Sequence, residues 1–172
     1  MQQFRPFTMA AALLVLMSTA SHAGSMEGGF DREHRGQGYA FFAPGGVFGE
    51  GGHTGTGHIG GGGEVLFYRG IGAGAEIGYL LPCGDFSSGI GILSADGSYH
   101  FMRGRKVSPF LTAGYSLGFR NGHGNLVNFG GGIHWWMKER LGLRLEFRDH
   151  VYGIGASMPV HFLGGRIGIA FR

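Results

Sequence analysis

Apolar and charged residues alternate one by one along Leu143–Arg148, which reads Leu-Arg-Leu-Glu-Phe-Arg. Successive side chains of a β-strand point to opposite faces of the sheet, so this segment predicts a strand with one apolar face and one ionic face. The same two-residue period recurs in many runs after residue 36, for example in 71–80, 107–119 and 125–137. The pattern therefore predicts an all-β chain whose strands separate apolar from polar side chains.

Turn residues divide the chain into eight such runs. We expect strands at about 37–44, 57–68, 71–80, 90–101, 107–119, 125–137, 141–152 and 160–171. Several have about 10 to 13 residues, which matches a strand that crosses a bilayer at a tilt, whereas soluble strands average about 5 to 6 residues. In 90–101, Ile90 and Ile92 share parity with Asp96, which predicts a bulge or a position at the rim.

The connections between these runs differ in expected length. Those after the second, fourth and sixth runs are short (69–70, 102–106 and 138–140), whereas the others are generally longer, including a first loop over Gly45–Gly55. Short turns on one rim and longer loops on the other are typical of outer-membrane barrels, whose short turns face the periplasm. We therefore predict that residues 37–172 form an eight-stranded antiparallel up-and-down transmembrane β-barrel, with both termini at the periplasmic rim.

The first 23 residues have the pattern of a secretory signal peptide. Arg5 is followed by an apolar run over Ala10–Met17 and by small residues that end at Ala23. The apolar run is too short to span a bilayer, which disfavours the alternative of a retained membrane anchor. We expect cleavage after Ala23, a flexible segment over 24–36, and export to the cell outer membrane.

Glycine is abundant, with 38 residues in 172, yet the chain has only 5 prolines, 13% aromatic residues and no Gly-X-Y period. In a narrow barrel, an inward glycine leaves space for a long side chain from a neighbouring strand. Parity along the strands predicts an interior network of charged side chains that are paired with one another. Its expected members are Glu64, Glu76, Asp96, Arg144, Glu146, Arg148 and Arg166.

Aromatic residues gather near both expected ends of the strands. Rings at two levels fit the aromatic girdles of a membrane barrel, although a soluble β-sandwich core could use the same residues. The girdle residues that we expect are Phe67, Tyr79, Phe119, Trp135, Trp136, Tyr152 and Phe171.

Charge and cysteine content add little to this interpretation. The formal net charge of +3 falls to +2 after removal of residues 1–23, because that segment holds Arg5 and no acid. This balance does not indicate nucleic acid as a partner, and export argues against it. Cys83 is the only cysteine, so the chain forms no internal disulfide.

Several segments resemble the outer-membrane β-barrel domain family, the small OmpA/OmpX-like barrels. Asn128–Trp136, the turn Lys138–Arg140 and Leu141–Asp149 resemble the last hairpins of that family, and Pro109–Tyr115 resembles its fifth strand. The resemblance covers roughly residues 37–172. It implies a terminal strand that ends in an aromatic residue read by the outer-membrane assembly machinery; here Phe171 is penultimate, which departs slightly from that ending.

Metal binding and hydrolysis are the two kinds of chemistry that the residue types in the sequence bring into question. His53, His58, His123 and His150 fall in or beside the expected outer loops, but none of them shows the spacing of a zinc site, so solvated loop histidines are the alternative to metal capture. Ser98 and His100 share parity with Asp96, so a hydrolytic cluster is conceivable. The lipid A deacylases carry a His-x-Ser-Asn order that is absent here.

The sequence thus predicts an integral outer-membrane barrel with a structural, envelope-integrity or surface-interaction role, without catalysis, cofactor or metal. Its expected partners are outer-membrane lipids, the assembly machinery and an unidentified ligand of the loops. The alternatives are a narrow channel or hydrophobic-ligand transporter and, less favoured, a lipid A-modifying enzyme.

Overall fold

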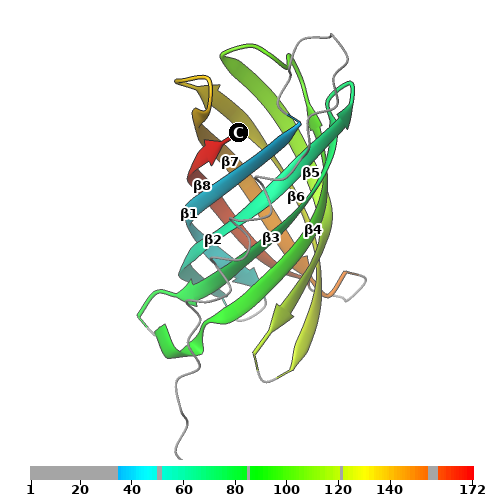
Figure 1. Cartoon of the computed structure of the whole chain (residues 1–172). Coiled ribbons are helices and arrows are strands. Elements are labelled where there is room, and N and C mark those ends of the chain that lie inside the picture. The colour runs from blue at the N-terminus through cyan, green and yellow to red at the C-terminus, as the bar shows by residue number, and fades with distance from the viewer. Residues whose placement is uncertain (1–34, 50–51, 85, 121, 155–158) are drawn as a thin grey trace, which may run out of the picture. The chain divides into compact units, whose positions relative to one another are not determined.

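The structure is a computed structural model, which describes residues 35–49, 52–84, 86–120, 122–154 and 159–172. These residues form eight strands and a short 3-10 helix, η2 (Phe86–Ser88) (Figure 1). The strands are β1 (Gly36–Gly49), β2 (Gly52–Tyr68), β3 (Ile71–Pro82), β4 (Ile90–His100), β5 (Val107–Phe119), β6 (His123–Trp136), β7 (Leu141–Tyr152) and β8 (Val160–Phe171). No helix within these ranges is long and apolar enough to cross a membrane.

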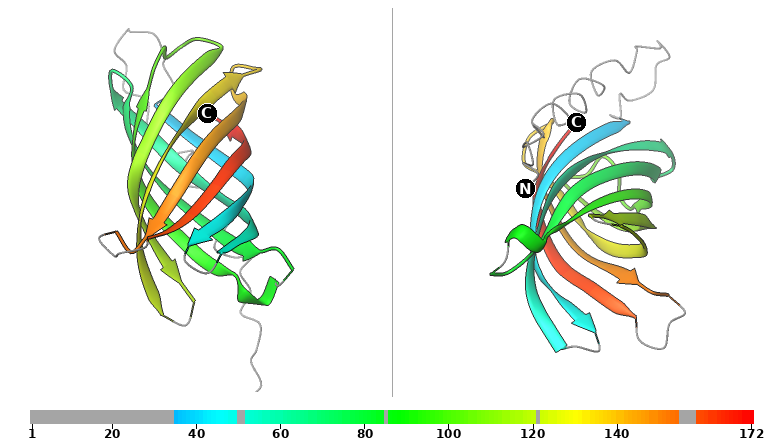
Figure 2. Two further views of the ribbon diagram at one scale, coloured as in Figure 1. Left: turned by 180° about the vertical axis from the view of Figure 1, so that it is seen from behind. Right: turned by 90° about the horizontal axis from the view of Figure 1, so that it is seen from below.

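Each strand pairs in antiparallel fashion with the next, and β8 pairs with β1, so the sheet closes into a barrel. Figure 2 shows this closure, with the red β8 beside the blue-to-cyan β1. The predicted fold class, an eight-stranded antiparallel β-barrel, is confirmed. Closure leaves no edge strand with unpaired backbone groups, which is the condition for a sheet in a hydrocarbon environment.

The barrel has two distinct ends. The terminal rim is the end at which β1 begins and β8 ends, together with the turns at 69–70, 101–106 and 137–140. The loop rim is the opposite end, with the connections 50–51, 83–89, 120–122 and 153–159. In Figure 1 the terminal rim is uppermost and is marked by the C-terminus.

The prediction of a long first loop is wrong. β1 and β2 continue in register from Phe42 opposite Ile59 to Gly49 opposite Gly52, so most of 45–55 belongs to the strands. Backbone hydrogen bonds hold this extension, and they need no alternation of apolar side chains to form. The difference in loop length between the two rims is therefore smaller than we expected.

Along β5 and β7, outward side chains are mostly apolar and inward side chains are mostly polar. On β5, Leu111 and Tyr115 are exposed outside the barrel, whereas Thr112 and Ser116 are buried inside it. On β7, Phe147 is exposed between the buried Glu146 and Arg148. This is the reverse of a soluble protein, in which apolar side chains fill the core.

Of the two alternatives predicted for 90–101, the bulge is wrong, whereas Ile90 does lie at the rim, as the first residue of β4. β4 keeps one unbroken register with both neighbours, and Ile92 points inward and is buried, so its parity with Asp96 reflects two inward residues on a regular strand. A register shift occurs instead between β2 and β3 at Leu66 and Tyr68, beside the turn at the terminal rim.

Inward glycines make room for neighbouring strands and side chains. A Cβ atom on Gly62 would lie 2.9 Å from the hydroxyl oxygen of Tyr39, and a Cβ atom on Gly132 would lie 2.8 Å from the Cα atom of Glu146 on β7. Real Cβ atoms do not approach other atoms so closely, so both positions require glycine. The narrow barrel depends on such positions.

Candidate functional site: the charged barrel interior

The barrel interior is built by the alternation seen in the sequence. β7 contributes three charged residues at every second position, and β2, β3, β4 and β8 contribute one each. All seven side chains of the predicted network point inward. Each of them has an ionic partner of opposite charge within the set. The seven are Glu64, Glu76, Asp96, Arg144, Glu146, Arg148 and Arg166.

Arg148 occupies the centre of the network and is only 2% exposed. Its guanidinium donates to Asp96 Oδ2 at 2.8 Å and to a carboxylate oxygen of Glu146, and Nη1 lies 3.7 Å from Glu76 Oε2. A weaker contact reaches the hydroxyl of Thr112 at 3.4 Å. One cation thus joins carboxylates from three strands, β3, β4 and β7.

Arg166 extends the network towards the loop rim. It donates to Glu76 Oε2 at 2.7 Å, and the same oxygen accepts a hydrogen bond from the Tyr39 hydroxyl at 3.1 Å. The guanidinium also stacks over the ring of Phe41, with Cζ 4.2 Å from the ring centroid. Such a stack supports a cation where water is excluded.

Arg144 extends the network towards the terminal rim. Its Nε donates to Glu146 Oε2 at 2.9 Å, and its guanidinium lies between the rings of Tyr39 and Phe110, with Cζ 4.1 and 4.3 Å from their centroids. A more distant ionic contact of 3.9 Å joins Arg144 to Glu64.

Glu64 contacts three polar side chains at the end of the network nearest the terminal rim. It accepts a hydrogen bond from the Gln37 amide at 2.6 Å and one from the Ser98 hydroxyl, and it contacts His100 Nε2 at 2.9 Å. The hydrolytic cluster considered from the sequence is not assembled, because Ser98 and His100 both bind Glu64, while Asp96 binds Arg148 and Asn128.

The network holds four carboxylates and three guanidiniums in a space with little room for water. Removing a charge from water costs several kcal/mol, and only close opposite charges and hydrogen bonds offset that cost. A cavity inside the barrel, lined by His58, His150 and Arg166 among others, has a volume of about 20 Å³. That is room for about one water molecule. The charged side chains therefore fill the middle of the barrel.

The predicted interior network did not include uncharged polar residues. Ser94, Ser116 and Asn128 form a hydrogen-bonded chain in which the Asn128 amide donates to Ser116 Oγ at 2.8 Å and to Asp96 Oδ1 at 2.8 Å. Their inward parity was visible in the sequence. The alternation that turns charged residues inward acts equally on uncharged polar ones.

Two histidines expected at the outer loops lie inside the barrel. His58 and His150 are 5% and 3% exposed, and their ring centroids are 5.8 Å apart. The prediction of solvated loop histidines is wrong for these two, because both lie at inward positions of their strands, His58 in parity with Glu64 on β2 and His150 in parity with Arg148 on β7. Among the described residues, no group of three or more His, Cys, Asp or Glu side chains is placed to hold a metal ion.

Comparisons with solved structures identify the architecture. Neisserial surface protein A matches with a TM-score of 0.60 at 10% identity, over 79% of this chain and 96% of that one. The N-terminal β-barrel domain of Pseudomonas aeruginosa OprF matches with a TM-score of 0.57 at 16% identity, over 80% of this chain and 96% of that one. The chain has the fold of the small outer-membrane β-barrels. No protein-family model and no curated protein matches the sequence.

Most predicted girdle residues point away from the interior of this barrel. Phe67, Trp135 and Phe171 are at the terminal rim, where they are 61%, 50% and 37% exposed. At the loop rim, Phe119 and Tyr152 are exposed and Tyr79 is half-buried. These residues form two aromatic levels on the outside of the barrel.

Trp136 is a correction to the predicted girdle. It is only 7% exposed, its ring lies beside that of His134 inside the barrel, and the Arg172 guanidinium covers it with Cζ 4.2 Å from the ring centroid. The physical reason is the strand itself, since Trp135 and Trp136 are consecutive and must point to opposite faces.

Proposed function

We propose that this protein is an integral outer-membrane β-barrel with a structural, envelope-integrity or surface-interaction role. The observation that carries this proposal is the separation of the two faces of the barrel. Large apolar residues such as Phe67, Leu111 and Ile167 are 61%, 56% and 57% exposed outside, while the charged network is buried inside. An outer surface of this kind would aggregate in water, whereas lipid chains cover it without penalty.

The proposal extends to partners and orientation. Membrane lipids contact the apolar exterior, and the assembly machinery inserts the barrel through its last strand, β8 (Val160–Phe171). The terminal rim faces the periplasm and the loop rim faces outward. A ligand of the loops remains part of the proposal, supported by the fact that one structural neighbour is described as a surface protein.

The test is electrophoresis of detergent-extracted envelopes with and without boiling. A membrane barrel keeps its compact form in cold SDS and changes its mobility when heated, because closure protects every strand from the detergent. We expect the protein in the detergent-extracted membrane fraction with heat-dependent migration. Release of the mature chain by osmotic shock alone would overturn the proposal.

A narrow channel is the second candidate, and the interior argues against it. Arg148 and its carboxylate partners fill the middle of the barrel. We expect no discrete conductance steps from purified protein in planar bilayers, and reproducible steps would support the channel. A changed lipid A mass profile on overexpression would support the enzyme instead.

A further inference from the structure

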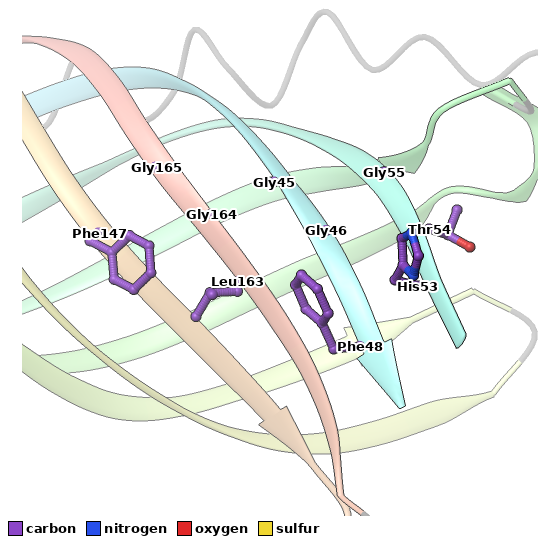
Figure 3. A pocket seen from close by; sticks show the side chains of 10 residues that line it. All are labelled: Gly45, Gly46, Phe48, His53, Thr54, Gly55, Phe147, Leu163, Gly164 and Gly165. Atoms are coloured by element: carbon purple, nitrogen blue, oxygen red, sulfur yellow. The ribbon is translucent and has the colours of Figure 1, made fainter. Parts of the chain in front are cut away.

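A groove of about 330 Å³ lies on the outside of the barrel near the loop rim, where β8, β1 and β2 run side by side (Figure 3). Its floor exists because outward positions on all three strands are glycine. Gly46 lies directly opposite Gly55, and Gly165 on β8 has nothing within 4 Å of where a Cβ atom would stand. Three neighbouring strands therefore present bare backbone side by side in the groove.

The walls of the groove are apolar. Phe48 from β1, Leu163 from β8 and Phe147 from β7 stand around the glycine floor (Figure 3). Phe48 and Phe147 are 47% and 56% exposed. These residues share the outward parity of the apolar belt, so in the proposed membrane orientation the groove opens towards lipid chains.

Polar groups stand at the loop-rim side of the same groove. Phe48 is opposite His53 on β2 and opposite His161 on β8, so one histidine flanks it on each neighbouring strand. His53 lines the groove, and His161 lies two residues from the lining residue Leu163 on the same face of β8. His161 Nδ1 is held by Asp149 Oδ2 at 2.7 Å, and Asp149 is 5% exposed. This contact fixes the imidazole ring and leaves its Nε2 for another partner. The N–H group of an imidazole ring donates hydrogen bonds to anionic oxygens.

We propose that the groove binds one acyl chain of a phosphate-bearing lipid from the leaflet at the loop rim, with the lipid phosphate between His53 and His161. This inference rests on the proposed membrane location. The groove matches a flexible chain because its lining is apolar and lacks side chains at its floor. The two imidazoles offer N–H donors to the phosphate oxygens at the loop rim, where the girdle residue Tyr152 is paired with Val160, the neighbour of His161.

The first test is photocrosslinking of a lipid probe to the groove, with and without a substitution that fills it. The folded barrel in dodecyl maltoside micelles receives a trace of phosphatidylglycerol with a photoactivatable acyl chain, and crosslinked peptides are identified by mass spectrometry. We expect crosslinks concentrated on the segments that contain Phe48, Phe147 and Leu163. Gly165→Leu places a side chain in the open space of the groove. A few methylene groups of the lipid probe then lose their burial, which lowers the crosslink yield at the groove about tenfold.

Gly97→Leu is the matched control. Gly97 is an outward glycine on β4 with only ordinary contact at its Cβ position, 3.8 Å from the carbonyl oxygen of Ala113. We expect this variant to keep the wild-type yield at the groove. Crosslinks spread evenly around the belt, or equal yields from the two variants, would overturn the proposal. Heat-dependent migration of each variant on gels verifies folding.

The second test addresses the phosphate. His53→Gln combined with His161→Gln should lower the yield with the phosphatidylglycerol probe about tenfold, since charge-assisted hydrogen bonds are lost, and leave the yield with a diacylglycerol probe unchanged. His123→Gln, a rim histidine on β6, is the control. An equal loss with both probes would overturn the role of the phosphate. Failure of the membrane location itself would look different, because the chain would then fractionate as a soluble protein.

Discussion

At the scale of single residues, the interior depends on how each buried charge is compensated. Arg148 satisfies Asp96, Glu146 and Glu76 together, and Asp96 has no second guanidinium in contact among the described residues. Glu146 and Glu76 also bind Arg144 and Arg166, respectively. Removal of the Arg148 guanidinium should therefore destabilise the ionised Asp96 carboxylate more than the carboxylates of Glu76 and Glu146.

We predict that Arg148→Met lowers the free energy of unfolding by about 3–5 kcal/mol, because it leaves buried carboxylates without their cation. Urea titration of the refolded barrel in lipid vesicles measures the change. Arg105→Met in the exposed turn after β4 is the control, with an expected change below about 1 kcal/mol. Equal effects of the two substitutions would mean that the interior ion pairs of Arg148 do not stabilise the barrel.

At the scale of the strands, glycines on the inner and outer faces have different tasks. Gly132 faces inward on β6, against the backbone of Glu146, whereas Gly63 faces outward on β2. A Cβ atom on Gly63 would lie 3.7 Å from the carbonyl oxygen of Gln37, which is ordinary contact. The same residue type is thus required at one position and replaceable at the other.

Gly132→Ala should destabilise the barrel by about 1–3 kcal/mol, because the added methyl group forces β6 away from β7. Gly63→Ala should stay within about 0.5 kcal/mol of the wild type. The measurement is again unfolding in urea, followed by tryptophan fluorescence. If both substitutions behaved alike, the close approach of β6 and β7 would not limit the barrel.

The outward face of a strand should also respond to depth in the membrane. Ala113→Arg, in the middle of β5, should cost about 2–4 kcal/mol in lipid vesicles, and Val107→Arg at the terminal rim about 0–1 kcal/mol, because a charge near the interface reaches water. Comparing unfolding in vesicles of the two variants tests this. Equal costs would mean that lipid does not cover the belt.

At the scale of the whole molecule, orientation follows from the even number of strands, which places both ends of the barrel chain at one rim. Cys83 is exposed at the other rim, directly after the end of β3. Because the chain has one cysteine, that thiol reports the side of the membrane on which the loop rim lies.

We predict that a membrane-impermeant maleimide labels Cys83 on intact cells. A Cys83→Ser chain with Lys138→Cys, which moves the thiol to the exposed turn at the terminal rim, should label only after the outer membrane is permeabilised. Gel shift or mass spectrometry reads the modification. The reverse pattern would place the terminal rim outside the cell.

Much of the architecture was predictable because it follows from the local alternation of apolar and polar residues along each strand. The bounds of β5, β7 and β8 agree with the expected strands, and the inward position of the charged residues followed from parity alone. The first hairpin was mispredicted because glycine-rich segments carry no apolar alternation, although their backbone groups still pair. Trp136 was misassigned because aromatic character does not distinguish the two faces of a strand, whereas consecutive residues must point to opposite ones.

The sequence by itself determined which face each side chain of a strand occupies, since a period of two residues is a property of the extended backbone. Only the tertiary structure decided which buried charges meet. Arg166 reaches Glu76 across 90 residues, and Arg148 reaches Asp96 across 52, because closure of the sheet brings β8 and β7 opposite β3 and β4. The outer groove arises in the same way, since its glycine floor forms where the last strand meets the first two.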